Sequence, residues 1–99
     1  MIYADNAATT RTTDTARQAM EAAMDQHFAN PSSLHTAGQL AKEALEDVRA
    51  RIAALIHCKQ NEIIFTSGGT EADNQALLSA ARAAAAALDE AAAGHIATA

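Results

Sequence analysis

Apolar side chains recur at helical spacing near the start of the chain. Between residues 14 and 28 they fall on one face at intervals of three and four, which predicts an amphipathic helix. Thr15, followed three residues later by Gln18, has the arrangement of a capping box and is the predicted start of this helix. The two methionines on the apolar face, Met20 and Met24, are predicted to fill a core.

A second helical pattern follows the only proline of the chain. Pro31 biases Asn30 away from helical geometry. We therefore expect the next helix to open at Ser32 or Ser33 and to run to about Ile56. Its outer face carries opposite charges four residues apart, an arrangement that stabilises a helix slightly. These pairs are Lys42–Glu46 and Asp47–Arg51.

The pattern changes in the last third of the chain. Residues 62–65, Glu-Ile-Ile-Phe, predict a short strand that is covered on both faces. A glycine turn and an alanine-rich helix from about Thr70 to Leu88 come next. Gly94 is the predicted end of the helical region, and residues 95–99 are the predicted opening of another strand. Helix, strand, glycine turn, helix and strand in this order are typical of a doubly wound α/β layout.

These elements predict an incomplete α/β unit that is rich in helix. The expected parts are an N-terminal arm over residues 1–13, a helical segment over residues 14–61, and the start of a larger domain over residues 62–99. That larger domain would contain a mostly parallel sheet flanked by helices. Parallel strands need partners on both sides, and one strand with the opening of another does not supply them.

Composition narrows the classes of function. Hydrophobic residues make up 49% of the 99 residues, and many of them are alanine, so helices should form readily but bury little area. A net charge of −5 argues against nucleic acid as a partner, and no stretch has the roughly 20 apolar residues of a membrane span. One cysteine excludes a disulfide framework. We expect no metal site, and the cytoplasm is the expected compartment because the start lacks a secretory pattern.

The glycine turn is the strongest candidate for chemistry. It consists of Ser67, Gly68, Gly69 and Thr70. A helix N-terminus offers unpaired N–H groups and a partial positive charge, and glycines let a ligand approach the backbone closely. The turn therefore predicts an anion cup suited to phosphate, provided that the carboxylates of Glu71 and Asp73 point away. From spacing alone, an ordinary N-cap at Thr70 after a tight turn is the alternative.

Three segments in a distinctive order indicate more about function than the residue spacing of the glycine turn alone. They are YADNAATT at residues 3–10, HFANPSSLH at residues 27–35 and EIIFTSGGTEADN at residues 62–74. Together they resemble the N-terminal portion of cysteine desulfurases of the NifS/IscS type, which are class V aminotransferase relatives that use pyridoxal 5′-phosphate. The resemblance implies fold type I of the pyridoxal-phosphate enzymes and a homodimer. It also implies removal of sulfur from L-cysteine, giving alanine and a persulfide that feeds a sulfur-acceptor protein for iron–sulfur cluster or thio-cofactor assembly.

The resemblance also gives roles to positions in this chain. The turn matching Gly69 and Thr70 grips the cofactor phosphate, and Ser67 and Gly68 are further candidates. Other positions are expected near the active site or the dimer contact, namely Asn6, Ala7, Thr9, Asn30 and His35. No catalytic residue is expected within the 99 residues, because the family's Schiff-base lysine and persulfide cysteine lie downstream. The chain alone is therefore expected to be inactive.

Two other interpretations stay open at this point. A selenocysteine lyase or another class V enzyme would share these motifs, because the residues that separate the reactions lie outside this sequence. A truncated, non-catalytic remnant or interaction module could instead dock its apolar faces on a full-length homologue.

Overall fold

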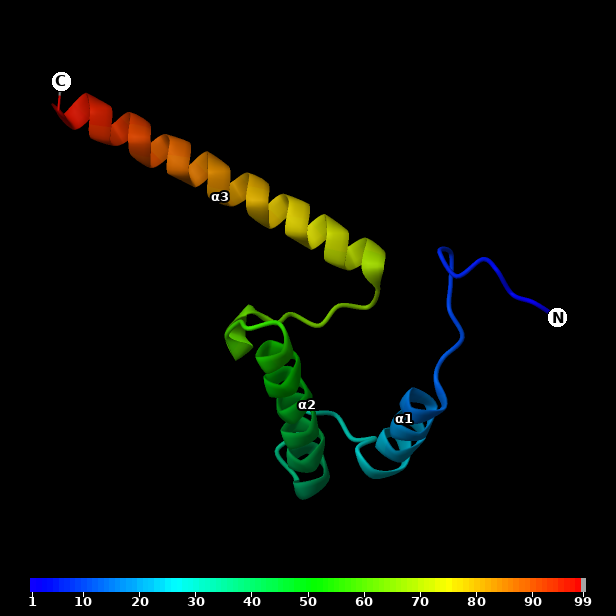
Figure 1. Ribbon diagram of the computed structural model, residues 1–99. Helices are drawn as coiled ribbons and strands as arrows, with labels where there is room; N and C mark the ends of the chain where they lie inside the picture. The colour runs from blue at the N-terminus through cyan, green and yellow to red at the C-terminus, as the bar shows by residue number, and fades with distance from the viewer. Residues whose placement is uncertain (99) are drawn as a thin grey trace. The chain divides into compact units, whose positions relative to one another are not determined.

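A computed structural model describes residues 1–98 and the side chains of residues 1–94. Its elements are α1 (Asp14–Gln26), α2 (Thr36–Leu55), the short 3-10 helix η1 (Gln60–Glu62) and α3 (Gly69–Thr98) (Figure 1). The chain divides into two units. The first covers residues 1–63 and contains α1, α2 and η1, and the second, from residue 64 on, contains α3.

Helix α1 confirms the first predicted helix but not its predicted cap. Thr13, not Thr15, is the N-cap, and its hydroxyl accepts the N–H of Ala16 at 3.2 Å. Thr13 has extended backbone angles, φ −67° and ψ 154°, which let a side chain turn back onto the first turn. Thr15 lies inside the helix. The helix ends at Gln26 rather than at Phe28.

Helix α2 begins later than predicted because the serines before it belong to a turn. The side chain of Asn30 accepts the N–H of Ser32 at 2.9 Å, and its backbone carbonyl accepts the N–H of Ser33 at 3.0 Å. The N-cap is His35, whose Nδ1 accepts the N–H of Gly38 at 3.2 Å. The helix therefore starts at Thr36.

Gly38 is where the Asn30–Ser33 turn meets α2. A Cβ built on Gly38 would lie 2.4 Å from the carbonyl oxygen of Ser33, 2.7 Å from the Cβ of Ser33 and 2.9 Å from the carbonyl oxygen of Asn30. Two of these atoms belong to the backbone, so the turn itself would have to move. The absence of a side chain at Gly38 is what allows the turn to pack on the first turn of α2.

The C-terminal end of α2 forms a Schellman motif. The N–H of Cys58 bonds to the carbonyl of Ala53 at 3.0 Å, and the N–H of His57 bonds to the carbonyl of Ala54 at 3.4 Å. His57 has a φ of 58°, in the left-handed region that glycine usually occupies here.

Arg49 ties the segment after η1 to α2. Its guanidinium donates to the carbonyl of Ile63 and pairs with Glu46 at 3.2 Å. Glu46 thus pairs with Arg49 rather than with Lys42, whereas the predicted Asp47–Arg51 pair is present at 3.8 Å.

The predicted strands are wrong for the residues that the structure describes. Residues 1–98 contain no strand, because Gln60–Glu62 form η1 and the backbone of the extended Ile63 bonds to Gln60 and Arg49 rather than to another strand. A strand needs a neighbour to pair its backbone groups. Gly94 does not end α3, which runs on to Thr98. Of the second predicted strand, residues 95–98 are helical and Ala99 lies outside the described residues.

Apolar side chains are almost entirely uncovered. Among the described side chains, only Ala41 and Ala53 are buried apolar residues. Met20 and Met24, which were predicted to fill a core, are 54% and 66% exposed. The chain exposes 8513 Å², whereas two separate compact bodies with the sizes of these units would expose only about 6,400 Å². The amphipathic faces are therefore formed, but most of their large apolar side chains remain exposed.

We expect Gly38→Ala to lower the stability of the first unit by about 1–3 kcal/mol, the usual cost of forcing extra volume into a close contact. Alanine is the better helix former by about 0.5–1 kcal/mol, so propensity alone would change stability in the opposite direction. Urea unfolding followed by far-UV circular dichroism measures the difference. Gly94→Ala is the matched control, since a Cβ there meets nothing within 4 Å. An equal increase in stability in both variants would show that the Asn30–Ser33 turn does not pack on α2.

His57→Gly should stabilise the same unit by about 1 kcal/mol, because glycine removes the cost of a side chain at positive φ. The same unfolding measurement reads this change as a higher midpoint. Lys59→Gly is the comparison, because Lys59 has the negative φ of −81° and gains nothing from this effect. A loss of stability in His57→Gly would contradict the Schellman geometry.

Candidate phosphate-binding site

The glycine turn directly precedes and opens α3. The N–H of Ala72 bonds to the carbonyl of Gly68 at 3.1 Å, so Gly68 is the N-cap and the helix begins at Gly69. Thr70 lies in the first helical turn and is not the cap. Within the described residues, the backbone N–H groups of Gly68, Gly69 and Thr70 have no acceptor, and the Thr70 hydroxyl has no partner either. These donors therefore gather at this end of α3.

The two glycines are not required by the chain's own geometry. Neither has a positive φ, and a Cβ built on Gly68 or Gly69 meets nothing within 4 Å. The turn therefore does not use the freedom of glycine to adopt positive φ, and the expected open approach to the backbone is present. Open space beside unpaired N–H groups at a helix N-terminus suits a tetrahedral anion. The residues present therefore fit a phosphate group.

Glu71 does not point away from the turn. Its Oε2 accepts the N–H of Ser67 at 2.9 Å and also accepts the hydroxyl of Ser67. The hydrogen bond from the Ser67 hydroxyl is the largest cause of a lowered pKa at Glu71, and the bond from the Ser67 N–H is the next. Both lower the pKa because they stabilise the charged carboxylate. Both donors of Ser67 are therefore already used inside the chain, unlike those of the residues that follow.

Two further hydrogen bonds involve carbonyl oxygens of the turn. The hydroxyl of Thr66 donates to the carbonyl of Gly68 at 3.0 Å, and the side-chain amide of Asn74 donates to the carbonyl of Thr70 at 2.9 Å. These bonds use carbonyl oxygens and leave the N–H groups of Gly68 to Thr70 untouched.

The N-terminal arm is organised by Tyr3, a residue that sequence reasoning did not single out. Its hydroxyl lies 2.9 Å from the carbonyl of Asp5 and 3.1 Å from the carbonyl of Thr9. The Asp5 carbonyl also accepts the N–H of Ala8 at 3.1 Å and the N–H of Thr9 at 3.3 Å. Asn6 and Ala7 are exposed within this turn. A hydroxyl that closes a loop has no periodic signal, which is why the pattern did not reveal it.

Asn30 and His35 meet in one structure at the start of α2. The Asn30 carboxamide holds its own turn, and the His35 ring caps the helix. Because Nδ1 of His35 accepts a hydrogen bond, the neutral ring carries its proton on Nε2. Both side chains thus have structural partners in the first unit, whereas the glycine turn belongs to the second.

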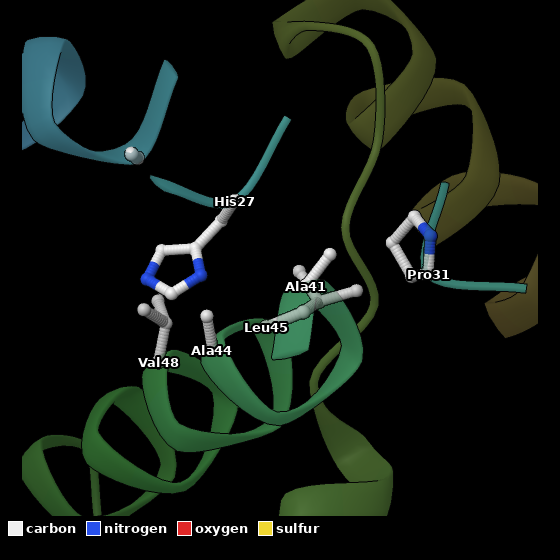
Figure 2. A pocket seen from close by; sticks show the side chains of 7 residues that line it. His27, Pro31, Ala41, Ala44, Leu45 and Val48 are labelled. Carbon is white, nitrogen blue, oxygen red and sulfur yellow. The ribbon is translucent and has the colours of Figure 1, made fainter. Parts of the chain in front are cut away.

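A groove between α1 and α2 is lined mainly by apolar side chains of the first unit. It has a volume of about 280 Å³. Figure 2 shows the His27 ring directed at α2, close to Ala44 and Val48. The groove is lined by Ala23, His27, Pro31, Ala41, Ala44, Leu45 and Val48. It holds no cluster of donors, so it does not match a phosphate.

Two other features are absent from the described part of the chain. No group of three His, Cys, Asp or Glu side chains there is placed to hold a metal ion. No helix there combines the length and the apolar character that a membrane crossing needs.

The sequence matches the family model of the aminotransferase class-V family over residues 2–97. It is 45% identical over 76 residues to the cysteine desulfurase IscS of Dictyoglomus turgidum, covering 77% of this chain and 19% of the relative. It is 44% identical over 82 residues to the putative cysteine desulfurase IscS 1 of Bacillus subtilis, covering 83% of this chain and 22% of the relative. It is 47% identical over 79 residues to a selenocysteine lyase of Xenopus laevis, covering 80% of this chain and 18% of the relative. No solved structure matches the chain.

The chain spans about a fifth of the length of the curated relatives it matches. The family model, in contrast, covers nearly all of the 99 residues and includes the arm, the Asn30–Ser33 turn and the glycine turn. On this evidence the chain belongs to the aminotransferase class-V family.

Proposed function

We propose that this chain is the N-terminal part of a pyridoxal-phosphate-dependent cysteine desulfurase. The observation that carries the proposal is the similarity to relatives named cysteine desulfurase, at 42–48% identity over most of this chain. The whole enzyme would remove sulfur from L-cysteine, leaving alanine and a persulfide for a sulfur-acceptor protein. We also propose the expected fold type I architecture, homodimer and cytoplasmic location for that enzyme.

The chain's own contribution would be to hold the cofactor by its phosphate. The N–H groups of Gly68, Gly69 and Thr70 and the hydroxyl of Thr70 are the donors available for this purpose. The partial positive charge at the start of α3 favours a dianion there. Pyridoxal 5′-phosphate, when bound, supplies the electron sink for breaking bonds of the amino-acid substrate. Fixing its phosphate end would orient the ring toward residues outside this chain.

The covalent chemistry is assigned to the rest of the enzyme. Lys42 lies in α2, Lys59 is the N-cap of η1 and Cys58 stands in the Schellman motif after α2. The resemblance implies that neither lysine is the Schiff-base lysine. We therefore propose that Cys58 is not the persulfide cysteine and that the 99 residues alone are inactive.

Selenocysteine lyase is the second candidate. Two Xenopus enzymes of that name are 46% and 47% identical to this chain, as similar as the desulfurases. Both reactions would use the same phosphate grip, because cysteine and selenocysteine differ only at the chalcogen atom. Comparing alanine release from L-cysteine and from L-selenocysteine, by an enzyme that contains this chain, separates the two candidates.

The interaction module remains a third candidate because the apolar faces of α1 and α2 are uncovered. Size-exclusion chromatography and circular dichroism of the purified chain distinguish it from a part of an enzyme. A folded monomer supports the module, and aggregation supports a part that needs the rest of its domain.

We expect the purified 99 residues to release no sulfide from L-cysteine above a buffer control, since the covalent groups lie elsewhere. A chimera in which this chain replaces the matching segment of the Dictyoglomus turgidum enzyme should desulfurate L-cysteine. Sulfide release by the 99 residues alone would contradict the assignment. A folded chimera that retains the cofactor but is inactive would contradict the desulfurase proposal.

In the same chimera, Thr70→Val should weaken cofactor retention by about tenfold, the usual effect of losing one hydrogen bond to a charged group. Gly69→Ala should also weaken retention, because its Cβ would occupy the space beside the N–H groups. Absorbance of the bound cofactor during dialysis measures retention. Gly94→Ala, on the same helix, is the control. Full retention in both turn variants would rule out this turn as the phosphate site.

A further inference from the structure

Ser67 and Glu71 form a closed pair at the edge of the glycine turn. One carboxylate oxygen of Glu71 accepts both the N–H and the hydroxyl of Ser67. The two residues are four apart, so the carboxylate reaches back across the glycines to the residue before them. This contact fixes the direction from which the chain enters α3, with the Thr66 hydroxyl bonded to the carbonyl of Gly68 on the same turn.

The pair divides the donors of the turn into two groups. Ser67 has no N–H or hydroxyl donor left for a ligand while the carboxylate holds it. The N–H groups of Gly68, Gly69 and Thr70, together with the Thr70 hydroxyl, remain without acceptors among the described residues. Although Ser67 is adjacent in sequence and has the chemistry of a phosphate ligand, its donors are directed at Glu71.

We propose that Glu71 is the positioning residue of the phosphate site: its carboxylate holds Ser67 outside the ligand shell and fixes the three N–H groups that follow. The identity of the anion rests on the proposed function. The position of Ser67 does not, because the contact with Glu71 exists within the chain itself.

The charge of Glu71 gives this arrangement a second consequence. A carboxylate in the first turn stabilises a helix whose N-terminus is free of other anions, but it repels a phosphate at the same end. Contacts with Ser67 lower the pKa of Glu71, so the carboxylate remains charged at neutral pH. Holding the carboxylate at Ser67, rather than over Gly68 to Thr70, would leave the donors open while limiting the repulsion.

The first experiment reads the pair without any ligand. Amide NMR of the purified chain compares the wild type with Glu71→Ala, Glu71→Gln and Asp73→Asn. We expect Glu71→Ala to move the Ser67 amide resonance and to speed hydrogen exchange at Ser67 by at least about tenfold, since a bonded N–H becomes exposed. Asp73→Asn removes the same charge in the same turn without touching Ser67, so it should leave that resonance in place. A Ser67 amide that does not respond to Glu71→Ala overturns the positioning role.

The second experiment uses inorganic phosphate as the probe in the same spectra. We expect phosphate to shift the amides of Gly68, Gly69 and Thr70, and we expect Ser67→Ala to change the affinity by less than about twofold, because Ser67 makes no ligand contact. Glu71→Gln keeps an acceptor for the Ser67 N–H but removes the charge, and it should bind phosphate several-fold more tightly. A tenfold loss in Ser67→Ala would place Ser67 in the ligand shell and overturn the inference.

The two experiments separate failure of the inference from failure of the proposed function. If phosphate shifts none of these amides in any variant while the Ser67 resonance still depends on Glu71, the phosphate site is wrong and the Ser67–Glu71 pair stands as a helix cap only. If phosphate binds but the Ser67 amide resonance does not depend on Glu71, the phosphate site stands and the positioning role is wrong.

Discussion

Every α-helix leaves its first N–H groups without an intrahelical partner, and the structure of this chain depends on how each helix meets that constraint. At α1 the hydroxyl of Thr13 accepts an N–H, and at α2 the ring of His35 does so. At α3 the nearest side chain, Glu71, turns back to Ser67 instead, and the N–H groups of Gly68 to Thr70 stay open. One N–H at the start of α1 and one at the start of α2 are thus capped by a side chain, whereas no side chain caps the start of α3, which can receive an anion.

A second constraint is the small area that the chain can bury alone. Helices rich in alanine form readily because alanine loses little entropy in a helix, but they gain little from the hydrophobic effect. The close contact at Gly38 and the Arg49 bond to Ile63 hold the first unit locally, yet the apolar faces of its helices remain exposed. A chain that spans about a fifth of its relatives' length is expected to find its core against the residues that the relatives have beyond it.

The sequence predicted the helices well because their signal is periodic and local. It misplaced the caps because a capping residue is defined by its backbone angles: Thr13 and Thr15 look alike in sequence, and only Thr13 is extended. It predicted strands at residues 62–65 and 95–99 from apolar runs, although a strand also needs a neighbour, which no composition reveals. His35 as a helix cap and Tyr3 as the centre of the arm were likewise hidden, since each acts through one hydrogen-bonding atom.

The glycine turn could be predicted from the sequence, and the structure shows which of its donors are open. Adjacent glycines before a helix indicate an approach to the backbone, and the space beside Gly68 and Gly69 is open. The direction of the Glu71 carboxylate could not be predicted, because one rotamer would block the donors and another holds Ser67. The most direct measurement is a crystal structure of the chimera with bound pyridoxal 5′-phosphate. We expect phosphate oxygens within hydrogen-bond distance, about 3 Å, of the nitrogens of Gly68, Gly69 and Thr70, with the Glu71 carboxylate still bonded to Ser67. A cofactor whose phosphate lies away from this turn would contradict it.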